Sequence, residues 1–165
     1  MSEFIEIEYN DEQVIRALRR APKIMGKHLN KGISNAAERV NKEERSQAPK
    51  GVSGLVNSIQ THIISPLERS VGPTVNYARA VEEGTSGGGT PPPVGNLLEW
   101  IRVKRITPRN PAMSDETLAR VISKSIGRQG TPANPFRKRT VEKMRSRVFD
   151  MIRESTEAGI REAWK

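Results

Sequence analysis

The sequence of 165 residues contains no cysteine, only two histidines and few aromatic residues, which make up 4% of the chain. The lack of cysteine excludes disulfide bonds, thiolate metal sites and cysteine nucleophiles. With His28 and His62 alone, a histidine-based zinc site is not expected. No stretch approaches the ~18–20 apolar residues of a membrane span, so we expect no contact with a membrane. The acidic N-terminus lacks the pattern of a secretory signal, and we expect synthesis in the cytoplasm.

Positive charge is concentrated in one part of the chain. The formal net charge is +9, from 28 Lys and Arg against 19 Asp and Glu. Residues 1–100 carry twelve charges of each sign, residues 101–147 carry thirteen basic and three acidic residues, and residues 148–165 have a net charge of −1. Such a basic block indicates a polyanionic partner, most often nucleic acid. A solvated face is the competing interpretation, because few aromatic residues accompany the block to stack on bases.

Eight residues of the basic block are candidates for contact with DNA or with an acidic protein surface. They are Arg102, Lys104, Arg105, Arg109, Arg128, Arg137, Lys138 and Arg139. Attraction between such residues and phosphates depends on salt and carries no sequence preference. The sequence alone leaves open which of the two partners the block contacts.

The chain length fits a single α+β domain over residues 1–165. Alternation in residues 3–9 predicts a half-buried strand, and Asn10 is expected to cap a long helix that ends near Ser46. Pro22 is expected to kink or interrupt this helix. One face carries an apolar stripe with spacings of three or four residues. The stripe consists of Val14, Leu18, Ala21, Met25, Leu29, Ile33, Ala36 and Val40.

Short strands are expected after the long helix. Residues 55–64 predict a strand that ends before Pro66, residues 70–72 predict a second one, and residues 75–81 form another short apolar segment. Consecutive strands joined by short turns favour a small antiparallel sheet or meander. We expect this sheet to pack against the long N-terminal helix and a C-terminal helix.

Residues 84–93, rich in glycine and proline, predict a flexible loop or an arm that becomes ordered on assembly. The loop lacks the Gly-Lys-Ser/Thr ending of a phosphate-binding loop, so no nucleotide site is expected. Residues 94–130 predict a helical insertion, with one helix over 94–104 and a second that Ser114 caps and that stops at Gly127 and Gly130. The apolar face of the second helix is expected to consist of Leu118, Val121, Ile122 and Ile126.

Asn134 and Pro135 predict the start of the last helix, as its N-cap and its first helical residue. Phe136 is expected to anchor this helix to the core, and Trp164 near its end is a candidate anchor of an interface. The inward face of the helix is expected to consist of Val141, Met144, Val148, Met151 and Ile152.

The sequence offers little for catalysis. His28 near the apolar stripe and His62 within a predicted strand are expected to be structural or surface residues. The glutamate pairs at 43–44 and 82–83 are sequence neighbours, whose side chains diverge, so neither predicts an acid–base or metal site. We expect the pair at 43–44 on a solvated helix face. We expect no enzymatic activity, cofactor or metal, and a nuclease is the least favoured alternative.

Four segments, in this order, resemble a known family. They are a proline loop with glycine and leucine at 48–59, Val-Gly at 71–72 followed by Tyr-Ala-Arg-Ala-Val-Glu-Glu-Gly-Thr at 77–85, the stretch 97–104, and residues 122–132 followed by Asn-Pro-Phe at 134–136. The pattern is similar to that of the minor tail component (tail protein Z-like) family of tailed bacteriophages and prophages, which includes tail-completion and head–tail joining proteins. The resemblance covers about residues 12–160.

The resemblance implies motif or assembly roles for nine positions. They are Pro49, Gly54, Leu55, Tyr77, Glu82, Gly84, Thr85, Pro135 and Phe136. The chain departs from the family pattern at Ser53, where threonine is common, and at Glu83, where an aromatic or apolar residue is common.

The family resemblance implies a structural protein of the virion, at the head–tail junction or the top of the tail. The resemblance also implies that copies of the chain form a six-fold ring, which completes the tail and joins it to the head connector. The implied partners are copies of this chain, tail-tube or terminator proteins, connector proteins and genomic DNA in the channel. A free-standing basic protein that binds nucleic acid without sequence preference is the alternative.

Overall fold

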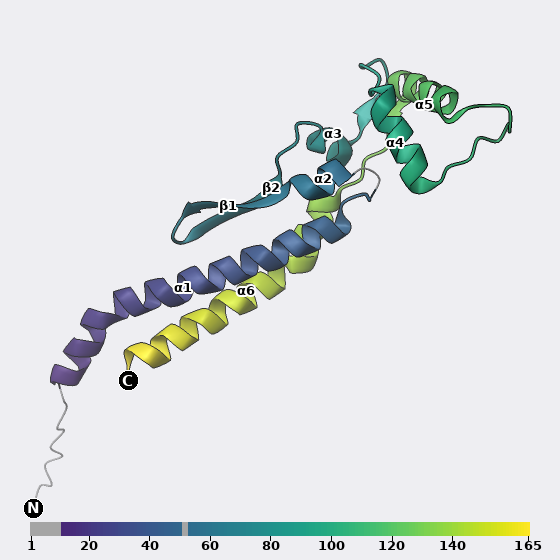
Figure 1. The fold of residues 1–165 in the computed structure, drawn as a ribbon. Helices are drawn as coiled ribbons and strands as arrows, with labels where there is room; N and C mark the ends of the chain where they lie inside the picture. The colour runs from purple at the N-terminus through teal and green to yellow at the C-terminus, as the bar shows by residue number, and fades with distance from the viewer. Residues whose placement is uncertain (1–10, 51–52) are drawn as a thin grey trace, which may run out of the picture.

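The structure, a computed structural model, describes residues 11–50 and 53–165 (Figure 1). In chain order its elements are α1 (Asp11–Gln47), α2 (Ser53–Ser58), β1 (Ile59–Ser65), β2 (Glu68–Pro73), α3 (Ala78–Glu83), β3 (Thr85–Ser86), α4 (Val94–Lys104), α5 (Asp115–Gln129), β4 (Gly130–Thr131) and α6 (Phe136–Ala163). Helices and small antiparallel sheets together confirm the α+β class. The strand predicted at 3–9 and the cap at Asn10 lie outside the described residues.

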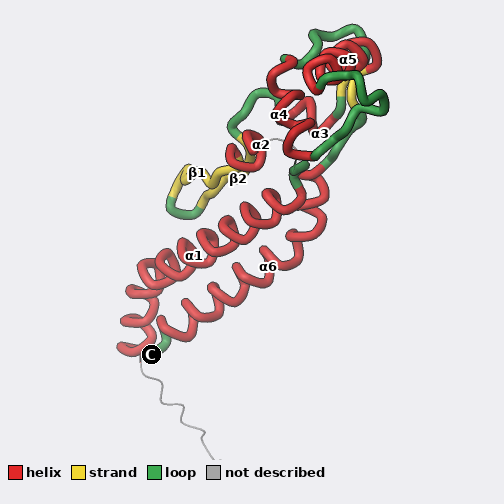
Figure 2. The backbone as a smooth tube through the Cα atoms, turned by 45° about the vertical axis from the view of Figure 1, so that its right-hand side comes forward, coloured by secondary structure: helices red, strands yellow, loops and turns green. Residues whose placement is uncertain are grey.

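The long helices α1 and α6 lie side by side and antiparallel along much of the molecule (Figures 1 and 2). Small residues let them approach closely: Ala36 and Ala37 of α1 and Gly159 of α6 are all buried. At Gly32, an added Cβ would lie 2.3 Å from the Ser155 hydroxyl oxygen. Close dispersion contacts at these small residues therefore help to hold the helix pair together.

The apolar stripe of α1 is covered where α6 and strands β1 and β2 lie beside it. Ala17 and Ala36 are buried, but Val14 and Leu18 near the start of α1 are 41% and 59% exposed. Helix α1 continues through Pro22, and its N-terminal part turns away from the line of the rest (Figure 1). A bend is expected where proline removes a backbone donor and its ring crowds the preceding turn.

Strands β1 and β2 form an antiparallel hairpin along α1, with Thr61 opposite Val71. The hairpin is tied to α1 by polar contacts. The Asn41 amide nitrogen donates to the Ile59 carbonyl at 3.4 Å, and the Arg69 guanidinium donates to the Asn30 side-chain oxygen at 2.7 Å. This arrangement agrees with the predicted sheet packed on the N-terminal helix.

The predicted start of the first strand was wrong. Residues 55–58 belong to α2, and the strand begins only at Ile59. Of the two predicted arrangements, a small antiparallel sheet or a meander, the structure has the first: β1 and β2 form a two-stranded sheet, and residues 78–83 form α3. Leu55 and Ile59 are both buried and stand four residues apart, a spacing that one helical turn and one strand face share. Short apolar runs of this kind do not distinguish helix from strand.

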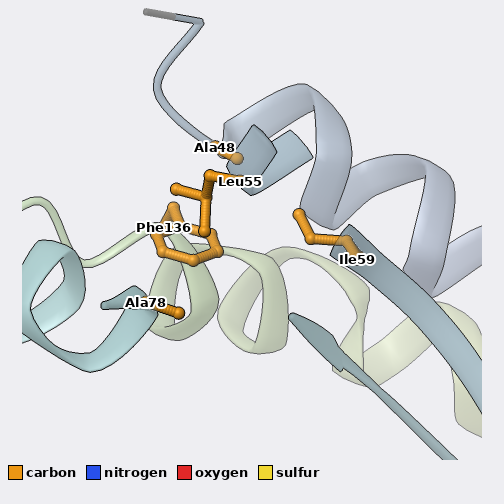
Figure 3. Packing of buried hydrophobic residues seen from close by; sticks show 5 residues of the cluster. All are labelled: Ala48, Leu55, Ile59, Ala78 and Phe136. Atoms are coloured by element: carbon orange, nitrogen blue, oxygen red, sulfur yellow. The ribbon is translucent and has the colours of Figure 1, made fainter. Parts of the chain in front are cut away.

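The main apolar cluster lies where the C-terminal end of α1 meets α2, β1, α3 and the start of α6 (Figure 3). It consists of Ala48, Leu55, Ile59, Ala78 and Phe136. Phe136 has no exposed surface, which confirms its predicted role as the anchor of the last helix. The cluster fixes the position of α6 relative to α1 at this end of the pair.

Helices α4 and α5 pack against each other to form a separate unit at one end of the molecule, here called the α4–α5 unit (Figure 1). Ser114 caps α5 as predicted, since its hydroxyl oxygen accepts a hydrogen bond from the Thr117 backbone N–H at 3.2 Å. Gly127 does not stop the helix, which ends at Gly130 with φ at 78°. Val121, predicted to face inward, is 53% exposed.

The glycine- and proline-rich residues 84–93 lie against α5. Strand β3 pairs with β4, the Gly88 N–H donates to the Gly127 carbonyl at 2.8 Å, and the Ser123 hydroxyl donates to the Pro92 carbonyl at 2.8 Å. A Cβ added to Gly130 would lie 1.8 Å from the Thr85 carbonyl oxygen, so this approach requires glycine. Among the helices of the described ranges, none has the length and apolar character needed to cross a bilayer.

Candidate functional site

Several of the nine motif positions, far apart in sequence, meet where the helix pair joins the α4–α5 unit. Pro49, Leu55, Tyr77 and Thr85 line an apolar groove of about 570 Å³, whose other wall includes residues 91–93. Gly54 lies against the Tyr77 hydroxyl group, because a Cβ on Gly54 would stand 2.9 Å from the hydroxyl oxygen. We call this feature the motif groove.

Glu82 caps α6 from a different element. Its carboxylate oxygens accept hydrogen bonds from the backbone N–H groups of Arg137 at 2.9 Å and Lys138 at 3.0 Å. These groups belong to the first turn of α6, where N–H groups have no partner within the helix. A carboxylate also interacts favourably with the positive end of the helix dipole. The role of this motif residue is therefore to fix α3 to the start of α6.

The predicted capping by Asn134 was wrong. Helix α6 begins at Phe136, with Pro135 just before it rather than inside it. The Asn134 side-chain oxygen instead accepts a hydrogen bond from Arg139 at 2.7 Å, and its backbone N–H donates to the Val81 carbonyl at 2.9 Å. Because Glu82 caps the helix from α3, a local N-cap side chain is not needed.

Glu44 is buried, contrary to the predicted solvated face, because α6 covers this part of α1. Its side chain is 4% exposed, and one carboxylate oxygen, Oε1, has no hydrogen-bond partner. The nearest cation is Arg137, whose Nε lies 3.4 Å from that oxygen, an ion-pair distance without the geometry of a hydrogen bond. Burial raises the pKa of Glu44, the Arg137 guanidinium opposes the shift, and the Glu82 carboxylate adds to it.

The neighbouring Glu43 lies in a different environment. It accepts hydrogen bonds at 2.8 Å from the Gln47 amide and the Lys143 ammonium group, and both lower the pKa of Glu43. No group of three His, Asp or Glu residues within the described ranges is arranged to hold a metal ion. Both glutamates therefore face cations of α6, Glu43 at Lys143 and Glu44 at Arg137. The pKa of Glu43 is lowered, whereas that of Glu44 is raised.

The histidines occupy structural and surface positions. His28 Nε2 lies 2.7 Å from Glu162 Oε2 and links α1 to the C-terminal end of α6. This hydrogen bond lowers the pKa of Glu162. His62 is exposed on β1.

The structure divides the eight basic candidates into two groups. Arg137 pairs with Glu44, and Arg139 donates to the Gln47 carbonyl at 3.2 Å, so both hold α6 against α1. The other six side chains are exposed, and none has a carboxylate within ion-pair distance in the part of the chain that the structure describes. These six are Arg102, Lys104, Arg105, Arg109, Arg128 and Lys138.

A second basic surface, on α1, is hidden by the zero net charge of residues 1–100. Residues 13–37 contain six basic residues and no acidic one, and acidic residues before and after them cancel the sum. All six side chains are exposed. The helical spacing of these residues was the sequence signal that could have revealed the surface. We call it the basic stripe: Arg16, Arg19, Arg20, Lys23, Lys27 and Lys31.

Large apolar side chains are exposed along helix α6 and at Trp164 just after it; we call this set the α6 outer face. Val141 is 62% exposed, Phe149 65%, Ile160 47% and Trp164 60%. The prediction that Val141 faces inward was wrong, whereas Met144 is buried and Val148, Met151 and Ile152 are half-buried as expected. The spacings between the four exposed residues are 8, 11 and 4 positions, which place them on one broad side of a helix.

The molecule exposes more surface than a compact monomer of its mass. Its accessible surface is 12392 Å², against roughly 8,200 Å² expected for a compact chain of this size. The twelve residues outside the described ranges add at most about 1,900 Å² even if fully extended. The remaining excess comes from the elongated arrangement of the helix pair and the α4–α5 unit (Figure 2).

Comparison with protein-family models, curated proteins and solved structures gave no match. Function is therefore inferred from the residues and surfaces of this chain.

Proposed function

We propose that this protein is a structural subunit of a tailed-bacteriophage virion, at the head–tail junction or the top of the tail. In this proposal, copies of the chain form a six-fold ring, which completes the tail and joins it to the head connector. The action is assembly, without a chemical step, a cofactor or a metal. The partners are further copies, tail-tube or terminator proteins and connector proteins.

The α6 outer face is the observation that carries this proposal. Phe149 and Val141 leave more than half of their side-chain surface in water, next to charged residues that form a polar rim. Large exposed apolar patches with a polar rim are typical of protein–protein interfaces. The excess accessible surface of the single chain points the same way, since association would cover it. A head-to-tail contact through such a face generates a closed ring when the rotation between copies closes.

The motif groove gives further support. The family resemblance depends on residues such as Pro49, Leu55 and Tyr77, which have no local reason to occur together. In the structure they line one groove, and Glu82 fixes the adjoining elements. Such a convergence is expected if these residues maintain a fold that this chain shares with the family it resembles.

The proposal is tested by electron microscopy and light scattering of the purified chain, alone and mixed with tail tubes. We expect rings, or addition of rings to tube ends. The double variant Val141→Ser/Phe149→Ser should remain folded by circular dichroism and lose ring formation. Val121→Ser, an equally exposed valine on α5, is the matched control and should assemble normally. If the parent chain joins neither a ring nor a tail, the proposal is wrong.

Binding of nucleic acid without sequence preference is the second candidate function. Six of the eight basic candidates are exposed and have no ion-pair partner in the described ranges, which favours this function, because such cations attract phosphates without a competing carboxylate. This function predicts salt-dependent binding of duplex DNA by a chain that never forms rings.

A further inference from the structure

We propose that the basic stripe on α1, rather than the basic block of residues 101–147, is the surface that contacts duplex DNA. The inference deepens the proposed function, and rests on it for the identity of the DNA as the genome in the channel. The binding surface itself is tested on the isolated chain, so that failure of ring assembly and failure of DNA binding are separate results.

The geometry of the stripe matches a linear array of phosphates. Arg16, Arg20, Lys23, Lys27 and Lys31 recur every three or four residues, so they lie on one side of a helix and opposite its apolar stripe. Measured along the helix, which bends near Pro22 between Arg20 and Lys23, this side is about 22 Å long from Arg16 to Lys31, at about 1.5 Å per residue. At 3.4 Å per base pair, that path covers at most about six base pairs of a duplex.

Most of these cations are free to bind a ligand. Arg16 is paired with Glu12 at 3.7 Å, and Lys27 lies close enough to Glu162 to help lower the pKa of that carboxyl group. The remaining four have no carboxylate within ion-pair distance in the described ranges: Arg19, Arg20, Lys23 and Lys31. A folded surface that keeps four adjacent cations unpaired costs electrostatic repulsion, which binding of a polyanion relieves.

Composition favours nucleic acid over a second protein as the partner. Half of the members of the stripe are lysine. Ile15 and Leu18 are exposed beside its N-terminal residues, whereas no apolar side chain is exposed from Lys23 to Lys31. Protein interfaces, by contrast, are centred on apolar and aromatic residues and are depleted in lysine. In the 101–147 block, by contrast, nine of the thirteen basic residues are arginine, the basic residue in which protein interfaces are enriched.

The basic stripe and the α4–α5 unit, which carries the first part of the 101–147 block, lie toward opposite ends of the molecule (Figure 1). Residues 137–147 of the block lie on α6 between them. Helix α1 alone is about 55 Å long, and screening in physiological salt acts over about 8 Å. Each region can therefore be neutralised without changing the potential at the other. This separation makes the assignment testable with two variants of equal charge.

The experiment measures binding of a 25-base-pair duplex of mixed sequence by fluorescence anisotropy, over a range of NaCl concentrations. The stripe variant carries Arg19→Gln, Arg20→Gln, Lys23→Gln and Lys31→Gln. The matched control carries Arg102→Gln, Lys104→Gln, Arg109→Gln and Lys124→Gln, which removes the same charge. Glutamine keeps helix propensity, and circular dichroism checks that both variants are folded.

We expect the stripe variant to lose at least about tenfold in affinity at 0.1 M salt and to reduce the slope of log affinity against log salt by about 3, because each phosphate contact contributes about 0.9. The control should change affinity less than about threefold. Equal losses in both variants, a larger loss in the control, or no duplex binding by the parent chain would each overturn the proposal. A stripe variant that binds DNA normally but changes its oligomeric state would assign the stripe to a second copy instead.

Discussion

Glu82 illustrates how a single side chain connects two elements that are distant in sequence. Its carboxylate binds the first-turn N–H groups of α6, while the next residue, Glu83, pairs with Arg79 on the surface of α3. The two glutamates differ in what they hold together, although they are identical and adjacent. Substituting each glutamate in turn therefore distinguishes the contribution of a helix cap to stability from that of an exposed ion pair.

We expect Glu82→Ala to lower the free energy of unfolding by about 1–2 kcal/mol, because two N–H groups lose their acceptor. Glu83→Ala is the matched control and should change it by less than about 0.5 kcal/mol, since exposed ion pairs contribute little. Urea unfolding followed by circular dichroism measures both. Equal effects of the two substitutions would contradict the capping role.

Glu44 predicts an unusual pH dependence. Because burial raises its pKa in the folded state, ionised Glu44 costs stability at neutral pH, and the cost disappears as the pH falls through the folded pKa toward 4.5. We expect Glu44→Gln, which resembles the protonated form, to be more stable than the parent chain by about 1 kcal/mol at pH 7. The difference should vanish near pH 4. A less stable variant at pH 7 would show that the Arg137 ion pair outweighs the cost of burial.

Glu43 is a control for which the opposite pH dependence is expected. Its pKa is lowered by Gln47 and Lys143, so its interactions stabilise the protein above its unfolded pKa and are lost as the pH falls through the lower, folded value. Glu43→Gln should therefore be less stable than the parent by about 0.5 kcal/mol at pH 7. The gap should close on acidification below pH 4.5. Thermal unfolding of the Glu43→Gln and Glu44→Gln variants, each compared with the parent chain between pH 3.5 and 7, tests both predictions.

At the scale of elements, two glycines of α1 predict opposite results. A Cβ on Gly26 would meet nothing within 4 Å, so Gly26→Ala should stabilise the protein by up to about 1 kcal/mol through helix propensity. A Cβ on Gly32 would stand 2.6 Å from the Ser155 Cβ, so Gly32→Ala should destabilise it by about 1–3 kcal/mol despite the same gain in propensity.

Rescue checks the cause of the Gly32 effect. The double variant Gly32→Ala/Ser155→Gly moves the side chain across the interface and should recover part of the lost stability. Calorimetric melting temperatures of the single and double variants provide the measurement. If Gly32→Ala stabilises the chain as Gly26→Ala does, the close packing of α1 on α6 described above is wrong.

At the scale of the whole molecule, the helix pair and the α4–α5 unit should differ in local stability. The helix pair is packed along most of α6, whereas α4 and α5 pack mainly on each other and bury few large residues, chiefly Ile101. Regions with few buried apolar contacts open at lower free energy. We expect faster amide exchange in α4 and α5 than in residues 141–155 of α6. Equal protection factors by hydrogen–deuterium exchange would contradict this prediction.

The sequence alone determined the features that depend on local patterns. The spacing of apolar residues predicted the long first helix and the last helix, Ser114 predicted the start of α5, and Phe136 was identified as a core anchor. These predictions succeeded because periodicity and capping act over a few residues. The α+β class follows from the same patterns.

Only the tertiary structure decided features that depend on packing between distant segments. The glutamates at 82 and 44 became a helix cap and a buried charge because α3 and α6 lie beside them, and no local pattern encodes that neighbour. The α2 helix and the exposure of Val141 depend in the same way on which side another element covers. The basic stripe was present in the sequence as a spacing, but only a continuous, uncovered α1 makes it one surface.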